Sequence, residues 1–587
     1  MSVNAYGMIF GVDSAMTSKS QHASQMAVAF VLAGLMLGGS SVLASEVPDA
    51  GSTLRQLQGL ELGKSVPVMP SPSSGTRREP TVQSDQASGP KVRVTRFRFA
   101  GNKSLSDAAL QKVVAPWTDG EFSFKELSLA LDAVAETYRS SGRLARVYFP
   151  QQEVSDGEIR IDVLESVMGQ LRFLDSTHRM DRDWFASYAQ RHLPQQGQEV
   201  LTPEIERVVR VANEIPGLSV AGNLVAGQHE GETDLALSVE DRAIFSGLLM
   251  ADNAGQKSSG SERVIAVLNS SGLSGQGDDW SLTLLKTRGV DYARVDVWLT
   301  DPWISGFKLG WLNSDMRYKI VSGDQVVNQP EGGAQSFGFQ AAYAIERSQS
   351  AQLNWKLSWE HKSFYNQNAS GPVSNYGLTV MNQQLAGFFA DTWVQGAMNS
   401  YVLSLSAGQV GLAGSPNQQD DQKTARTEGR FSKWSYGFTR QQNLDDQWNL
   451  TTAFSGQWAS QNLDSSEKFY IGGPTSVRAY PASEAGGSRG YQFNIDLHRP
   501  FDGDKTVGVF YDHGRVTVAA QPWDQSLNKL DLHGYGVSAQ WQMLPKTRLK
   551  ALASWRTGRN PNPTSTGMDQ DGTLKSPRVW LEAAHSF

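Results

Sequence analysis

Cysteine is absent from the 587 residues, and long apolar segments are scarce. Without cysteine the chain can form no disulfide and no thiolate metal site, which suits passage through an oxidising compartment. After residue 45, no segment approaches the roughly 18 apolar residues that a membrane-spanning helix needs. The net charge of −6 is mildly acidic, so it gives no reason to expect a nucleic-acid partner, whose phosphates attract positive charge.

Motifs of enzymatic sites are also missing. The nine histidines show neither H-x-x-x-H nor H-E-x-x-H spacing, and G-x-S-x-G does not occur. The glycine-rich segment 486–490 precedes a strand pattern and lacks the Lys-Ser/Thr pair of a phosphate-binding loop. The sequence therefore predicts a protein that is not an enzyme, with no catalytic residue, no metal site and no cofactor.

Aromatic residues and glycine are abundant, with 16 Trp, 16 Tyr, 24 Phe and 56 Gly. The second half alternates apolar and polar residues, as strands do; residues 353–360 are a clear example. A soluble β-sandwich would also alternate, but it would not need Trp and Tyr at the ends of its apolar faces. We therefore expect a mainly β protein in which residues 242–587 form a 16-stranded transmembrane β-barrel, with about 22 residues for each strand and its connection.

The N-terminus has the features of an export signal. Lys19 precedes an apolar run at 26–37, and Val42 and Ala44 satisfy the small-residue rule for cleavage. We expect residues 1–44 to be a signal peptide cleaved after Ala44, with Met16 as a second candidate start. The alternative is an N-terminal membrane anchor.

Residues 45–90 are rich in Ser, Pro, Gly and Gln. Their composition predicts a linker, preceded by a possible short helix with Leu54, Leu57 and Leu60 on one face. We expect Gly59 and Gly63 to cut this helix short.

Two small α/β modules precede the barrel region. Residues 91–166 read as strand, helix, helix, strand, strand, and residues 167–241 repeat this order. In the second module we expect Thr202 to cap a helix with Pro203 at its first position. Three strands leave each sheet an open edge, which could bind an extended peptide by β-augmentation. The alternative is that the modules are rigid spacers that bind nothing.

Two motifs in the barrel region contain an arginine and an aspartate that could form a pair. Residues 472–481 form a glycine-led turn that carries Arg478. Residues 507–514 read as a strand whose less apolar face holds Asp512. An aspartate there needs a partner or water, and Arg478 is a candidate. The alternative is an ordinary turn beside an ordinary strand aspartate.

These motifs resemble the V-R-G-Y sixth loop and the F-x-D-x-G strand of two-partner secretion transporters, outer-membrane barrels of the haemolysin secretion/activation type. Their superfamily also holds the barrel-assembly proteins. The resemblance implies a latch between loop and barrel wall made by Arg478, Tyr480, Phe510, Asp512 and Gly514. Ala479 stands where the family commonly has glycine, so we expect the turn to differ in detail, because alanine tolerates positive φ poorly.

Four further segments resemble this family. Residues 150–157 resemble the P-x-Q-x-V-x-x-G turn of the first polypeptide-transport-associated (POTRA) domain, and residues 213–218 resemble the N-D-x-P-G-V turn of the second. Residues 251–263 resemble the D-N-x-G…G-x-x-R opening of the barrel. The terminal Phe587 resembles the insertion signal that the outer-membrane assembly machinery reads. By this resemblance residues 91–166 and 167–241 are the two POTRA domains.

The resemblance implies an outer-membrane transporter with its modules in the periplasm, and it implies that the possible short helix within residues 45–90 is a plug helix followed by a linker. We expect it to bind an unfolded, β-helical exoprotein of the haemolysin or adhesin type through that protein's N-terminal secretion domain. The exoprotein would cross the barrel without ATP. The expected partners besides this cargo are outer-membrane lipid and the assembly machinery, and the expected state is a monomer. The alternatives are an assembly factor of the same superfamily and a porin or receptor barrel.

Overall fold

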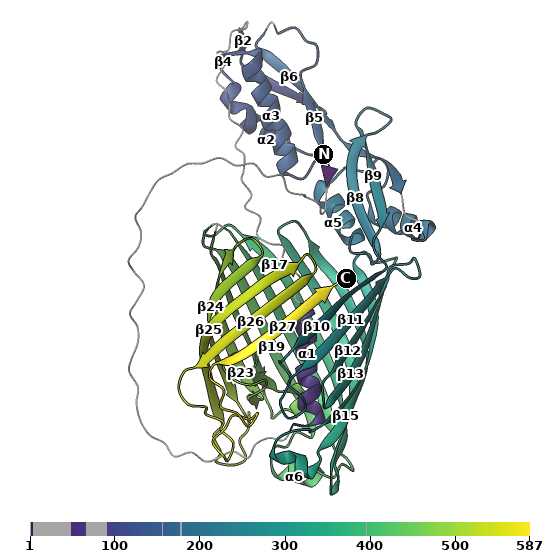
Figure 1. Cartoon of the computed structure of the whole chain (residues 1–587). Helices are drawn as coiled ribbons and strands as arrows, with labels where there is room; N and C mark the ends of the chain where they lie inside the picture. Colours follow the sequence, from purple (N-terminus) through teal and green to yellow (C-terminus); the bar gives the residue numbers. More distant parts are fainter. Residues whose placement is uncertain are drawn as a thin grey trace, which may run out of the picture.

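The computed structural model describes residues 2–3, 48–65, 91–154, 156–175, 179–394, 396–445 and 447–587. Two α/β modules lie beyond one mouth of a closed barrel, and a helix lies inside the barrel (Figure 1). Most of the expected signal peptide and the expected linker at 66–90 fall outside the described residues. In the part described, no helix combines the length and apolarity needed to span a membrane.

The first module packs two helices on a three-stranded sheet of order β3-β6-β5. Ser123 begins α3 with a capping box: its hydroxyl accepts from the Glu126 amide, and the Glu126 carboxylate accepts from the Ser123 amide. Leu127, Val134 and Tyr138 form an apolar stripe along α3 and are buried. The elements are β2 (Lys91–Val94), β3 (Arg96–Ala100), α2 (Asp107–Val114), η1 (Ala115–Trp117), β4 (Gly120–Ser123), α3 (Phe124–Ser140), β5 (Ala145–Tyr148) and β6 (Glu158–Glu165).

The second module has the sheet order β1-β8-β9-β7, where β1 (Ser2–Val3) pairs with β8. The expectation that Thr202 caps α5 is wrong. Leu201 is the N-cap without a side-chain hydrogen bond, and Pro203 lies in the first turn, where its missing N–H leaves no bond unmade. The other elements are β7 (Val167–Asp175), α4 (Arg182–His192), α5 (Thr202–Ala212), β8 (Leu218–Ala226) and β9 (Glu232–Asp241).

A small polar cluster joins the two modules. The Ser104 hydroxyl lies 2.8 Å from Glu165 of the first module and 2.7 Å from Glu199 of the second, and Arg143 Nε donates to Glu199 at 2.7 Å. Burial alone would raise the pKa of the Glu165 carboxyl, but hydrogen bonds from Ser104 and Tyr138 hold that pKa below its ordinary value. The Glu165 carboxylate is therefore charged at neutral pH and takes part in the contact between the two modules.

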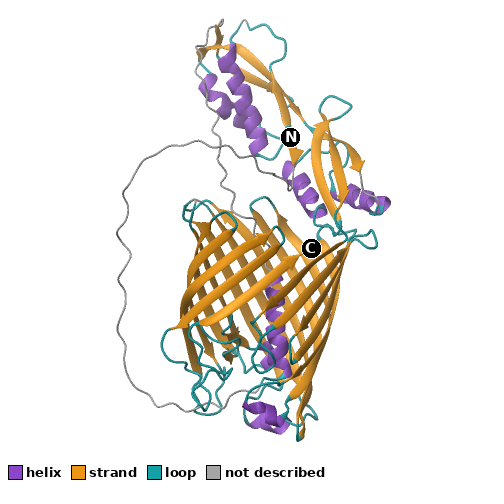
Figure 2. Cartoon of the chain, in the orientation of Figure 1, coloured by secondary structure: helices purple, strands orange, loops and turns teal. Residues whose placement is uncertain are grey.

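Sixteen antiparallel strands form the barrel, as expected, and β27 closes it against β10. Figure 2 shows the strands tilted around a lumen that contains a helix. The strands are β10 (Phe245–Asp252), β11 (Arg263–Ser271), β12 (Asp278–Lys286), β13 (Val290–Thr300), β14 (Phe307–Lys319), β15 (Glu331–Arg347), β16 (Ala351–Asn368), β17 (Gly371–Asp391), β18 (Ala397–Gly411), β19 (Gly429–Asn443), β20 (Asn449–Ala459), β23 (Arg489–Phe501), β24 (Lys505–Thr517), β25 (Lys529–Leu544), β26 (Thr547–Arg556) and β27 (Arg578–Ser586).

Alternation sorts the barrel side chains between two faces. Trp359 on β16 is exposed on the outside, whereas Lys362 on the same strand is buried inside. Short elements lie in the connections: η2 (Asp324–Asn328), α6 (Gln418–Lys423), η3 (Ser465–Glu467), β21 (Phe469–Ile471) and β22 (Ala485–Gly487).

The second module docks on the turns of the near mouth of the barrel. Arg347 at the end of β15 makes a two-point ion pair with Glu214, with nitrogen–oxygen distances of 2.5 and 3.0 Å. Lys308 donates to the backbone oxygen of Glu214 at 3.1 Å. Glu214 belongs to the Asn-Glu-Ile-Pro-Gly turn, so this motif fixes the module to the barrel.

The helix in the lumen is α1 (Ala50–Ser65). Its side chains Leu54 and Leu57 are buried in a cluster with apolar residues of the barrel wall. The expectation that Gly59 and Gly63 cut the helix short is wrong, because α1 continues through both. Packing of one face against the barrel offsets the low helix propensity of glycine.

Candidate functional site: the lumen and its inward loop

The connection between β20 and β23, residues 460–488, folds back into the lumen, and we call it the inward loop. Gly472 and Gly473 have φ values of 105° and 99°, which only glycine adopts readily. They turn the chain so that Arg478 faces the inner wall of β23 and β24. The glycine-led turn of the sequence is therefore a reversal inside the barrel.

Arg478 and Asp512 are in direct contact. Arg478 Nε lies 2.9 Å from Asp512 Oδ2 and Nη2 lies 2.6 Å from Oδ1, while the Arg478 backbone amide donates to Oδ2 at 2.9 Å. The Asp512 side chain is fully buried and that of Arg478 is 8% exposed. One carboxylate thus fixes both the side chain and the backbone of the loop.

Asp496 on β23 is a second partner that the sequence analysis missed. Arg478 Nη1 lies 2.6 Å from Asp496 Oδ1, and Nη2 lies 3.1 Å from Oδ2. The guanidinium also stacks over the ring of Phe510, with 3.5 Å between the carbon Cζ and the ring centroid. Arg478 therefore uses its forked donors and its flat face at once, which lysine cannot do.

The backbone oxygen of Arg478 extends the contact to two more strands. Ser554 Oγ on β26 donates to it at 2.6 Å, and Trp580 Nε1 on β27 donates at 2.8 Å. One loop residue thus joins β23, β24, β26 and β27, the last of which closes the barrel.

The remaining expected latch residues surround this contact. Tyr480 is buried, and its backbone oxygen accepts from Gly473 at 3.1 Å, which closes the turn. Gly514 has no side chain, so Val477 fits against the wall; a Cβ there would lie 2.9 Å from Val477 Cγ2. The structure brings Arg478, Tyr480, Phe510, Asp512 and Gly514 together around one turn, and their function as a latch stays a prediction.

The expected difference between this turn and that of the family stays a prediction, and the structure shows how Ala479 is accommodated. It is not among the residues with positive φ, so the alanine backbone is unstrained. Its methyl group faces Gly534 on β25, where an added Cβ would lie only 2.5 Å away. Because the facing wall residue, Gly534, has no side chain, the methyl group of Ala479 fits between the loop and the wall.

A second ion cluster anchors the other arm of the inward loop. Glu467 in η3 pairs with Lys362 on β16 at 2.9 Å and with Lys433 on β19 at 2.7 Å. All three side chains are at most 5% exposed. The sequence analysis missed this cluster, since nothing in the spacing of these residues indicates that they meet.

Comparison with known proteins identifies the lineage. Residues 231–540 match the model of the haemolysin secretion/activation protein family ShlB/FhaC/HecB, and residues 92–166 match the ShlB-type POTRA domain. The chain belongs to the ShlB/FhaC/HecB family. It is accordingly an outer-membrane transporter of the two-partner secretion type, which secretes an exoprotein.

Curated relatives support this assignment over most of the transporter. The heme/hemopexin transporter protein HuxB of Haemophilus influenzae is 24% identical over 504 residues, covering 84% of this chain and 86% of the relative. The outer membrane transporter CdiB of Escherichia coli O6:K15:H31 is 22% identical, covering 76% and 73%. Among solved structures, CdiB from Escherichia coli aligns with a TM-score of 0.63 at 17% identity, covering 94% of this chain and all of that one.

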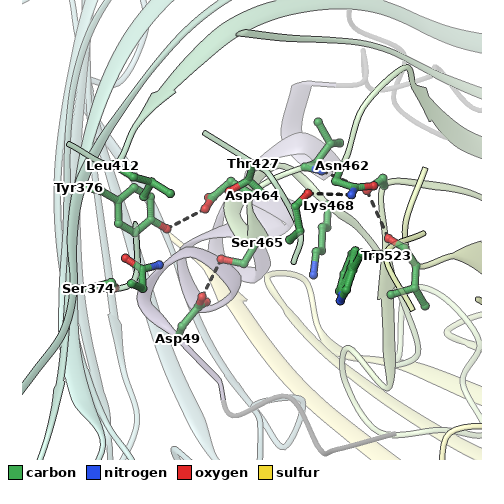
Figure 3. A pocket seen from close by; sticks show the side chains of 15 residues that line it. Asp49, Ser374, Tyr376, Leu412, Thr427, Asn462, Asp464, Ser465, Lys468 and Trp523 are labelled. Carbon is green, nitrogen blue, oxygen red and sulfur yellow. Dashed lines mark hydrogen bonds between the residues drawn. The ribbon is translucent and has the colours of Figure 1, made fainter. Parts of the chain in front are cut away.

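The inner helix of the transporter begins against the inward loop. Asp49 accepts from the Ser52 amide at 2.7 Å and from Ser465 Oγ of the loop at 2.8 Å. The Asp49–Ser465 contact lines a pocket of about 140 Å³ (Figure 3). On another side of this pocket Tyr376 donates to Asp464 at 2.8 Å. The helix and the loop thus share one end of the lumen.

The middle of α1 also contacts the inward loop and the wall. Arg55 Nε donates to the Lys468 backbone oxygen at 3.3 Å, and Gln56 donates to Ser483 at 2.5 Å. A cavity of about 740 Å³ remains beside α1, lined by residues of the helix, the loop and the luminal wall. The helix and the loop therefore fill part of the transporter lumen.

Residues at the closing strands explain two of the sequence motifs. Asp252 on β10 makes a two-point ion pair with Arg263 on β11, at 2.7 and 3.0 Å, so these two motif residues join the first hairpin. Phe587 exchanges backbone hydrogen bonds with Gly247 at 3.1 and 3.2 Å, and its ring lies where a Cβ of Gly247 would be. Phe587 is half exposed, and its role as an insertion signal stays a prediction.

Proposed function

We propose that the two modules bind an unfolded exoprotein in the periplasm and that the chain then crosses the lumen beside α1 and the inward loop. Folding at the cell surface makes the transfer one-way without ATP. We further propose a β-helical cargo of the haemolysin or adhesin type, recognised through its N-terminal secretion domain. The sequence contains no phosphate-binding loop, which supports a driving force from folding.

The observation that carries the binding step is the open edge of β5. In the described part of the first module, β5 pairs only with β6. The Leu144 oxygen accepts from Ser166 at 2.8 Å, so alternate residues bond to β6 and the amides of Ala145 and Val147 point to the open side. Two outward amides on an edge strand are what an extended peptide needs for pairing.

The proposal is tested by reconstitution. The purified transporter is placed in liposomes, and the N-terminal fragment of an exoprotein encoded beside its gene is added without nucleotide. We expect the fragment to become protected from external protease. A variant lacking residues 91–166 serves as the control and should give no protection; equal protection by both would contradict binding by the first module.

We also propose that the transporter works as a monomer in outer-membrane lipid and that the assembly machinery recognises Phe587. The sequence analysis left an assembly factor of the same superfamily as an alternative, and the family match favours the transporter. The two functions separate on one measurement. Loss of the transporter should stop secretion of its exoprotein and leave the amounts of other outer-membrane barrels unchanged.

Displacing α1 is expected to open the lumen. Deleting residues 45–66 should raise or destabilise single-channel conductance in planar bilayers, because a helix about 10–12 Å wide leaves the channel. A paired test uses two helix glycines. A Cβ at Gly51 would lie 2.3 Å from Ser465 Oγ, whereas one at Gly59 meets no atom within 4 Å. Gly51→Leu should therefore reproduce the open channel, and Gly59→Leu should not.

Conductance traces that are identical for the deletion and the intact transporter would show that α1 does not act as a plug. Equal effects of the two leucine variants would show that the contact with Ser465 does not hold the helix in place.

A further inference from the structure

A pair of histidines lies on the outer face of the barrel, away from the lumen and the inward loop. His513 on β24 and His533 on β25 are directly opposite each other in the strand register. Their Nδ1 atoms are 3.1 Å apart, and their ring centroids are 4.4 Å apart. Asp531 contributes a carboxylate, and ligand atoms of the three residues all lie within 4.8 Å of one another.

The position of the pair follows from the strand pattern. Val507, Val509 and Tyr511 of β24 are exposed on the outer face, and His513 continues this series. The C-terminus of β27 lies at the module end of the barrel (Figure 1), so antiparallel alternation takes the Thr517 end of β24 to the opposite mouth. The histidines therefore face outward near the cell-surface end of the wall.

We propose that His513, His533 and Asp531 bind a divalent transition-metal ion such as Zn²⁺. Imidazole nitrogen and one carboxylate oxygen are ligands that zinc prefers, whereas Mg²⁺ and Ca²⁺ prefer sites made only of oxygen. Two nitrogens bound to tetrahedral zinc at about 2.0–2.1 Å lie roughly 3.3 Å apart. The 3.1 Å between the two Nδ1 atoms is close to this separation. The two rings are stacked at 29°, so turning them about their side-chain bonds, with the strands in place, would point both lone pairs at one ion.

Two of the three proposed ligands, His513 and Asp531, have hydrogen-bond partners that could orient them. The Tyr491 hydroxyl lies 3.3 Å from His513 Nε2, so the nitrogen that would not bind metal has a hydrogen-bond partner. Arg515 Nε donates to Asp531 Oδ1 at 2.6 Å and holds the carboxylate in place. Partners of this kind orient metal ligands in proteins.

An ion at this position would join β24 to β25 from outside. Asp512 is the chain neighbour of His513 and Gly534 is the chain neighbour of His533; both face the inward loop. The ion would therefore fasten together the two strands against which Arg478 and Ala479 pack.

The test is metal binding by the full transporter, purified in detergent without a histidine tag and treated with chelator. Calorimetric titration with ZnCl₂ in excess MgCl₂ should show one tight site. Because they remove ligands, His513→Gln and His533→Gln should each weaken it by more than the roughly 10–100-fold that loss of an outer partner costs, and Asp531→Asn should weaken it less than either. His361→Gln is the matched control: His361 is an exposed histidine of β16 that pairs across the strands with Thr379. It should bind zinc as the unchanged chain does.

A second readout separates ligation from folding. Zinc should raise the thermal unfolding temperature of the unchanged chain and of the His361 variant, but not of the His513 or His533 variants. If these two fail to fold, the Asp531 variant and the unchanged chain still decide the matter. Absence of a tight site in the unchanged chain, or equal loss in the His361 variant, would overturn the proposal, and the short Nδ1–Nδ1 distance would then be an ordinary hydrogen bond.

Discussion

Secretion is expected to be nearly abolished when Arg478 is replaced by alanine. The substitution leaves the fully buried carboxylate of Asp512 and the largely buried one of Asp496 side by side without a cation. Removing one member of a buried ion pair costs about 3–5 kcal/mol. The loop backbone loses its orientation at the same time, and with it the hydrogen bonds from Ser554 and Trp580.

Substitution of Asp512 should be milder than substitution of Arg478. In Asp512→Ala the guanidinium keeps its two hydrogen bonds to Asp496, so the charge is not left alone. Arg478→Lys should restore little secretion, because an ammonium group cannot serve two carboxylates in a forked geometry and stack on Phe510. This order of severity is specific to a guanidinium held by two aspartates.

A double-mutant cycle on secreted cargo tests the contact directly. The Arg478→Ala, Asp512→Ala double variant should be no worse than Arg478→Ala alone, with comparable amounts of barrel in the outer membrane. Arg317→Ala is the control, because Arg317 is 72% exposed and its pairing with Asp315 contributes only about 0–1 kcal/mol. Strictly additive losses would mean that the two residues act separately, and the latch would have to be abandoned.

Deleting residues 91–166 is expected to stop secretion while the barrel still inserts. The first module has a hydrophobic core of its own, separate from that of the second module. The deletion therefore leaves the ion pair between Glu214 and Arg347, which holds the second module to the barrel, in place. Immunoblots of the membrane and of the medium measure insertion and secretion in the same culture.

A single substitution sharpens this experiment. Val147→Pro removes an amide from the open side of β5 and leaves the bonds to β6 intact, which edge strands tolerate. Val147→Ala trims the same side chain and keeps the amide. We expect the proline variant to lose secretion and the alanine variant to retain it. Similar secretion by both would exclude pairing at this edge, and the first module would then be a spacer.

Local sequence patterns predict the features that depend on strand alternation. They do not predict contacts between segments that are far apart in the chain. Turn chemistry and a period of two place Arg478 in a turn and Asp512 on the luminal face, and those side chains are in contact. Glu467 contacts Lys362 and Lys433 only because the inward loop folds into the lumen. The spacing of these residues in the sequence does not indicate that fold. Tertiary packing likewise extends α1 past Gly59.

The histidine pair shows the same limit for binding sites. His513 and His533 are 20 residues apart, far from any metal-binding spacing within one helix or turn. Strand register alone makes them neighbours. A search by motif therefore predicts no metal site, although pairing of adjacent strands creates a candidate.

The two anchors of the inward loop have a mechanical consequence. Glu467 is tied to β16 and β19, whereas Arg478 is tied to β23 and β24, and only β20 lies between these two sets of strands in the ring. The segment between the two anchors is a strut between neighbouring arcs of the wall. A cylinder of strands can flatten into an ellipse without breaking a hydrogen bond between neighbours, and a strut opposes that deformation. Releasing either end would let the cross-section change shape, so the bore available to a passing chain depends on the loop as well as on the number of strands.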